Sequence, residues 1–151
     1  MRKILIIFLF IGLITLSGCT SDAPATSGDS TRMIQFSGYS WKVKSNLTPV
    51  GPGPNIFSNN TNNVRVDAAG HLHMKITREG NQWACAEIIS EKNFGYGNYV
   101  FTLKTDPKVL DPEIVLGLFT WDDNPEFFHR EIDIEFSQWE IPGNKNAQYV
   151  V

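Results

Sequence analysis

The sequence predicts an all-β protein. Short alternating or aromatic-rich runs are separated by glycine, proline, asparagine and aspartate, and no window of a dozen residues shows a capped amphipathic helix. Several short strands with frequent turns indicate a sandwich or a barrel. The predicted strands are residues 34–43, 64–66, 72–77, 84–90, 99–104, 114–121 and 131–136.

The first 18 residues predict an export leader rather than part of the fold. Arg2 and Lys3 precede an apolar run over residues 4–16, which is too short to span a bilayer comfortably. Residues 16–19, Leu-Ser-Gly-Cys, resemble a bacterial lipobox, so Cys19 is the candidate lipidation site. An ordinary signal peptide or a single membrane anchor is the alternative. We therefore expect an exported chain, lipid-anchored at the cell envelope.

Residues 19–32 predict a tether, because they are mostly small and polar and show no apolar periodicity. The globular domain is expected over residues 33–151. If Cys19 carries lipid, Cys85 has no partner for a disulfide, and a buried structural thiol is the favoured interpretation.

The charge balance excludes some partners. The whole chain has a formal net charge of -3, and loss of residues 1–18 leaves 11 basic and 16 acidic side chains, a net charge of -5. Such a surface gives no reason to expect nucleic acid or anionic lipid as a partner. An uncharged polymer fits it. The sequence does not indicate the oligomeric state.

Residues 131–136, Glu-Ile-Asp-Ile-Glu-Phe, are the most informative stretch. In a strand, Glu131, Asp133 and Glu135 share one face and the apolar residues share the other. Carboxylates at every second position of a strand are about 6 to 7 Å apart from one to the next. They repel one another, which raises the pKa of at least one of them. From the residues alone, catalysis, metal binding and a plain acidic face all remain open.

Four segments of the chain, which follow one another in the family's order, resemble glycoside hydrolase family 16, the lichenase, laminarinase and xyloglucan transglycosylase group. Residues 129–136 resemble its E-x-D-x-E active-site strand. Residues 86–90 (Ala-Glu-Ile-Ile-Ser) and 94–99 (Phe-Gly-Tyr-Gly-Asn-Tyr) are similar to two upstream strands of the family. Residues 115–121 are similar to the strand that leads to the acidic one. The resemblance implies a concanavalin A-like β-jelly-roll sandwich.

The resemblance also implies catalytic roles. Glu131 is expected to be the nucleophile, Glu135 the general acid/base, and Asp133 a helper that hydrogen-bonds Glu131. Residues four apart on a flat strand have Cα atoms about 13 Å apart, whereas a retaining enzyme needs carboxyl groups about 5 to 5.5 Å apart. Retention of configuration is therefore an implication of the family and not of the spacing.

Substrate contacts are expected mainly at positions that match the family. Glu87 is expected to contact a sugar hydroxyl, with a strand-face carboxylate paired to Lys or Arg as the alternative. Tyr96 is a candidate cleft aromatic, Trp121 belongs to the loop that tunes substrate choice, and His129 should face the side of Glu131. Trp139 is a candidate for either the cleft wall or the core.

No cofactor is indicated by the sequence. His71 and His73 share a strand face and could hold a metal, but they lack a third ligand nearby, so a solvated face is favoured. A structural calcium is compatible with the family without being indicated.

The shorter E-x-D-x-E signature favours a glucan with β-1,3 and β-1,4 linkages, hydrolysed or transferred by an endo-acting enzyme. Sandwich domains of this kind commonly need about 200 to 250 residues, so we expect a C-terminally truncated domain whose longer parent is active and which is itself weak or inactive. The alternatives are a non-catalytic glycan-binding surface lipoprotein, an inactive fragment of such an enzyme, or a structural envelope lipoprotein.

Overall fold

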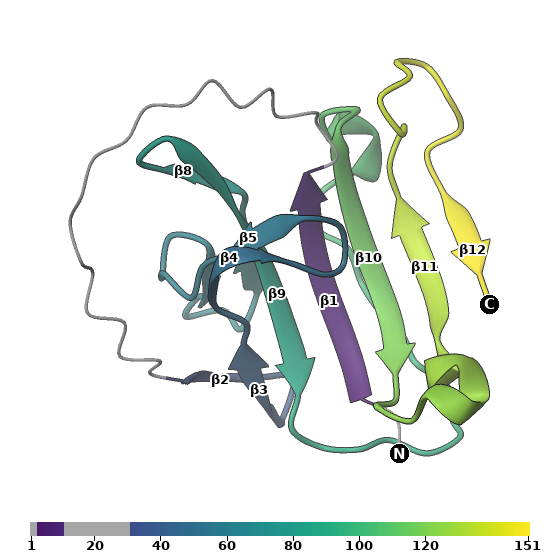
Figure 1. Ribbon diagram of the computed structural model, residues 1–151. Coiled ribbons are helices and arrows are strands. Elements are labelled where there is room, and N and C mark those ends of the chain that lie inside the picture. Colours follow the sequence, from purple (N-terminus) through teal and green to yellow (C-terminus); the bar gives the residue numbers. More distant parts are fainter. Residues whose placement is uncertain (1–2, 11–30) are drawn as a thin grey trace.

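The computed structural model describes residues 3–10 and 31–151, and it has the all-β, jelly-roll-like architecture that the sequence predicts (Figure 1). The predicted lipidation site, Cys19, and most of the predicted tether lie outside the described residues. The strands are β1 (Lys3–Phe10), β2 (Arg32–Phe36), β3 (Tyr39–Val43), β4 (Asn46–Val50), β5 (Asn55–Phe57), β6 (Val64–Val66), β7 (Leu72–Met74), β8 (Thr77–Glu79), β9 (Gln82–Ser90), β10 (Ile114–Trp121), β11 (Ile132–Phe136) and β12 (Gln148–Val150), with 3₁₀ helices η1 (Pro107–Val109) and η2 (Pro125–Arg130).

A curled sheet in the order β12-β11-β10-β1-β9-β3-β2 forms the body of the molecule, and each neighbouring pair in it is antiparallel. The first half of β9 pairs instead with β5, in parallel, and with β8. Because β9 serves both groups of strands, the β4–β5 hairpin lies in front of the sheet, across β9 and β1 (Figure 1). Strands β6 and β7 form a separate two-stranded sheet.

The most informative difference from the sequence analysis concerns β1. The sequence predicts that residues 1–18 are a leader outside the fold, yet Lys3–Phe10 lies in the centre of the sheet between β9 and β10 (Figure 1). A continuous apolar run suits a central strand as well as a leader, because both faces of such a strand are covered.

Most predicted strands are present with adjusted bounds. Residues 34–43 divide into β2 and β3 at Ser37 and Gly38, whose φ angles of 52° and 79° form a tight hairpin turn. The strand predicted at 99–104 is wrong: Tyr99 and Phe101 pack against the core from irregular structure. In this stretch the aromatic residues indicate burial against the core and not hydrogen-bonded pairing with another strand.

Two apolar clusters lie on the two faces of the sheet. The larger contains Ile88, Leu118 and the buried β1 residue Ile6, with Ile134 and Phe136 packed against it. The smaller contains Phe57, Cys85 and Phe119, with Ile89 and Trp121 packed against it. Cys85 is 1% exposed, so the prediction of a buried thiol is confirmed.

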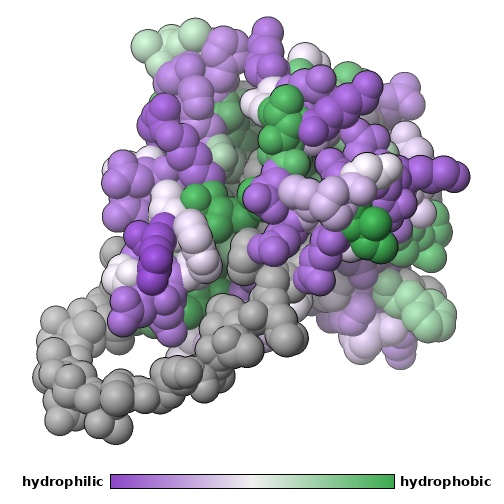
Figure 2. Space-filling view, turned by 90° about the horizontal axis from the view of Figure 1, so that it is seen from above, coloured by the Kyte–Doolittle hydropathy of each residue, from purple (hydrophilic) through white to green (hydrophobic). Residues whose placement is uncertain are grey.

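The surface seen from above is mainly hydrophilic, with hydrophobic residues in separate groups between polar ones (Figure 2). Within residues 3–10 and 31–151, no helix has the length and apolar character needed to cross a bilayer.

Candidate active site

Strand β11 has the two-faced character that its alternation predicts. It pairs with β10 so that Asp133 lies beside Phe119 and Glu135 beside Gly117. Directly paired residues of antiparallel strands share a face, so these acids lie on the side of the smaller cluster. Ile134 and Phe136 face the larger cluster. Glu131 precedes the strand and caps η2 in an extended conformation.

The three acids border one cleft of about 530 Å³, in front of β3, β9, β10 and β11. Its other residues come from four parts of the chain that are distant in sequence. They are Lys42, Lys44, Gly51, Pro52, Glu87, Ile89, Glu91, Gly117, Phe119, Trp121 and Asp123. Glu131 and Asp133 also border a second hollow of about 680 Å³ on the β12 side.

The carboxyl groups of Asp133 and Glu131 differ electrostatically from carboxyls in free solution. Burial, then repulsion from Glu131 and Glu135, raises the pKa of Asp133 to about 6. Burial also raises the pKa of Glu131; His129 opposes this shift and Glu135 adds to it. Repulsion between neighbouring acids therefore contributes to both raised pKa values, after burial.

Asp133 has an unusual local environment. Its Oδ1 atom is buried and has no hydrogen-bond partner in the described part of the chain, so the expected bond to Glu131 is not made through this oxygen. The Gln148 side chain, from β12, donates a hydrogen bond to Glu135 Oε2. A protonated Asp133 could donate through Oδ1, which would remove an unfavourable buried acceptor.

Glu87 lines the same cleft and is only 1% exposed. Its Oε2 accepts a hydrogen bond from Lys44 Nζ at 2.8 Å, and Lys44 Nζ also bonds the Gly51 carbonyl at 2.6 Å. Burial raises the pKa of Glu87, against the lowering effect of Lys44. Both interpretations of Glu87 thus have support: it faces the cleft, and a lysine pairs with it.

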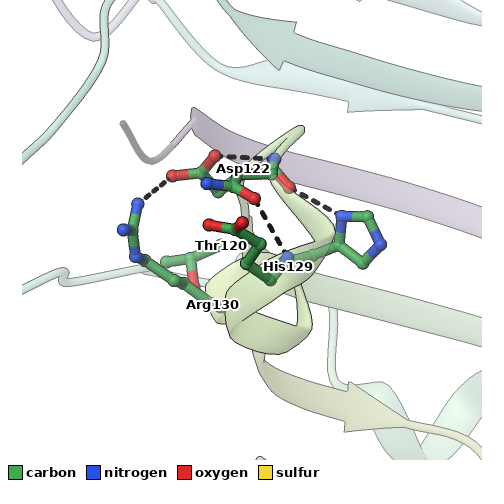
Figure 3. A network of polar contacts seen from close by, with 6 residues as sticks. Thr120, Asp122, His129 and Arg130 are labelled. Carbon is green, nitrogen blue, oxygen red and sulfur yellow. Dashed lines mark hydrogen bonds and ion pairs between the residues drawn. The ribbon is translucent and has the colours of Figure 1, made fainter.

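Trp121 lines the cleft beside the acids, and the His129 ring stacks against its indole. Their rings stack with centroids 4.1 Å apart and an angle of 8° between the planes. His129 Nδ1 donates to the Asp122 carbonyl at 2.8 Å, since a carbonyl oxygen can only accept (Figure 3). His129 supports the indole of Trp121 at the cleft, although it does not itself line the cavity.

The turn that carries His129 is fixed by polar contacts (Figure 3). Arg130 pairs with Asp122, and the Thr120 hydroxyl donates to the Arg130 carbonyl at 2.9 Å. Phe128, His129 and Arg130 have φ angles of 49°, 56° and 49°, a left-handed run without glycine. Such a run costs roughly 1 to 2 kcal/mol per residue, so the contacts of Asp122 and Thr120 hold a strained turn directly before Glu131.

Two of the predicted substrate residues lie elsewhere. Tyr96 is 97% exposed and does not line the cleft. Trp139 lies in the turn after β11, at a φ of 47°, and does not line it either. Lys42 and Lys44 were missed. Lys42 lies near the end of the strand predicted at residues 34–43 and Lys44 directly follows it, so their spacing of two was the available signal that they share a face.

Within the described residues, no group of three or more His, Cys, Asp or Glu side chains is placed to hold a metal ion. His73 Nε2 instead contacts Asp67 Oδ2 at 2.8 Å, at the turn between β6 and β7. Comparisons of the chain with protein-family models, curated proteins and solved structures found no match.

Proposed function

We propose that the cleft binds a β-1,3/1,4-linked glucan and that the chain is a retaining endo-glycoside hydrolase or transglycosylase of the family 16 type. The observation that carries the proposal is the convergence of Glu131, Asp133 and Glu135 on one cleft beside Trp121. Two neighbouring carboxyl groups on one cleft can provide a nucleophile and an acid/base, and an indole stacks on a sugar ring.

In the first step, the Glu131 carboxylate attacks the anomeric carbon while Glu135 protonates the departing glycosidic oxygen. The carbon–oxygen bond to the leaving sugar breaks, and a glycosyl ester forms on Glu131. Water, or a sugar hydroxyl in transfer, then attacks the same carbon. Glu135 takes its proton and Glu131 is released. Asp133 lies between the two glutamates in the strand. When it is protonated, below its pKa of about 6, it adds no negative charge beside Glu131.

A covalent-trapping experiment tests the proposal even if turnover is slow. The full chain, with Cys19→Ser, is incubated with an activated 2-deoxy-2-fluoro β-cellobioside, which slows release of the glycosyl ester. We expect the intact mass to increase by one 2-deoxy-2-fluorocellobiosyl group, which is a disaccharide, and peptide mapping to place the label on Glu131. Glu131→Gln should abolish labelling, whereas Glu91→Gln, which removes another carboxyl of the same cleft, should leave it within about threefold.

Hydrolysis provides the second measurement. Reducing-sugar release from lichenan should exceed the background and fall to background in Glu131→Gln, with the first product keeping its anomeric configuration. If the chain bound lichenan but showed neither labelling of Glu131 nor release of reducing sugar, the proposed enzyme would be refuted in favour of a glycan-binding lipoprotein.

We also propose that Cys19 is the lipidated residue of an exported chain. Metabolic labelling with a radioactive fatty acid should mark the chain and should be lost in Cys19→Ala. An unlabelled wild-type chain would refute the anchor without bearing on the cleft.

A further inference from the structure

Strand β1 joins the two halves of the candidate site. On one side it pairs with β10 over eight residue pairs, from Lys3 with Trp121 to Phe10 with Ile114. On the other it pairs with β9 over four, from Leu5 with Ile89 onward. The described residues contain no ladder between β9 and β10 themselves. The acids of β11 and the Glu87–Lys44 pair are therefore connected, within this sheet, through β1.

The registers define a row of residues across this junction. Glu135 is paired with Gly117, Gly117 with Ile7, and Ile7 with Glu87. Three steps between neighbouring strands, of about 4.7 to 4.9 Å each, separate Glu135 from Glu87 by roughly 14 Å. The width of the cleft thus depends on one strand being present in this position.

Removal of β1 would leave an unusual gap. Strands β9 and β10 run parallel to each other, each would present an unpaired edge, and Ile88 and Leu118 would lose their buried neighbour Ile6. A gap one strand wide with apolar residues behind it fits an extended apolar segment that runs antiparallel to both edges.

We propose that β9 and β10 form an acceptor slot for one apolar β-strand. Lys3–Phe10 fills the slot in the uncut chain, and once the chain is cut behind it this segment exchanges for a second copy of the same apolar sequence. The apolar composition of Lys3–Phe10 suits both a removable leader and a central strand. The proposal rests on this combination. The acceptor role does not depend on the proposed hydrolase activity.

The register is tested first, in the full chain with Cys19→Ser and Cys85→Ala. Ile6 and Leu118 are direct Cα partners, so a disulfide should form between cysteines at these positions. In the control, cysteines replace Ile7 and Leu118. A slip of one residue reverses the face of a strand, and this pair should not crosslink. Equal crosslinking of both pairs, or of neither in a chain that unfolds cooperatively, would overturn the assigned slot.

Exchange of the strand is tested next, after a protease site has been inserted among residues 20–28 and cut. The cut N-terminal fragment should remain bound to residues 29–151 and should be displaced by a fluorescent peptide of residues 1–12 with a lysine tail. A peptide with prolines in place of Leu5 and Ile7 loses backbone donors and should bind at least about tenfold more weakly. The proposal is wrong if the native peptide does not bind, or if the proline peptide binds as well.

Discussion

Asp133→Asn should make the protein more stable at neutral pH while impairing its chemistry. The folded protein raises the pKa of this carboxyl from 3.8 to about 6. Well below pH 3.8 the group is protonated in both the folded and the unfolded chain, so its ionisation does not change the free energy of unfolding. As the pH rises from 3.8 to 6, the unfolded chain ionises first, so the free energy of unfolding falls.

The size of the effect follows from the shift. A pKa raised from 3.8 to about 6 corresponds to at most about 3 kcal/mol. Asp133 is only partly buried, so solvent screening reduces this value, and we expect about 1 to 2 kcal/mol. The asparagine side chain has nearly the same shape and does not ionise, which removes this loss.

Urea unfolding of wild type and Asp133→Asn should be measured from pH 4 to pH 8. The two proteins should have similar free energies of unfolding near pH 4, and the variant should gain about 1 to 2 kcal/mol by pH 7.5. Asp123→Asn is the matched control, because it removes an exposed carboxyl from the same cleft, and the gain of about 1 to 2 kcal/mol should be confined to Asp133→Asn. If Asp133→Asn were less stable than wild type by the same amount at every pH, the electrostatic account of Asp133 would be refuted.

Two further predictions concern the walls of the cleft. Lys44→Met should lower the free energy of unfolding by about 3 kcal/mol, because it leaves Glu87 buried and unpaired, whereas Lys42→Met, at an exposed lysine, should cost less than about 0.5 kcal/mol. Denaturant unfolding checks this, and equal losses would contradict it. Trp121→Ala should weaken binding of a glucan oligosaccharide about tenfold by calorimetry, with Trp83→Ala as a control outside the cleft; unchanged affinity would exclude Trp121 as a sugar platform.

The acidic strand could be predicted from sequence because its evidence is local. Alternation places Asp133 and Glu135 on one face of any strand, and the structure retains that arrangement. The bounds of β10 are also those predicted, since a compact apolar run is enclosed by turn residues. The all-β class follows from the same kind of information.

The remaining features depend on contacts between distant residues. Lys44 and Glu87 are 43 positions apart, and no periodicity within either segment could pair them. The position of β1 was missed because an unbroken apolar run carries no period that separates a leader from a buried strand. The left-handed turn at residues 128–130 was missed because Phe, His and Arg do not mark that conformation, as glycine or asparagine would.

The left-handed turn also offers a route by which the cleft could diversify. Phe128 is 89% exposed, so its backbone strain is not offset by burial of its own side chain. Glycine or asparagine at this position would adopt the same backbone at lower cost. The protein would gain stability from such a change, and this gain could offset destabilising substitutions near Trp121 in the cleft. Relief of strain in this turn would thus give stability that changes in the cleft wall could draw on without rebuilding the sheet.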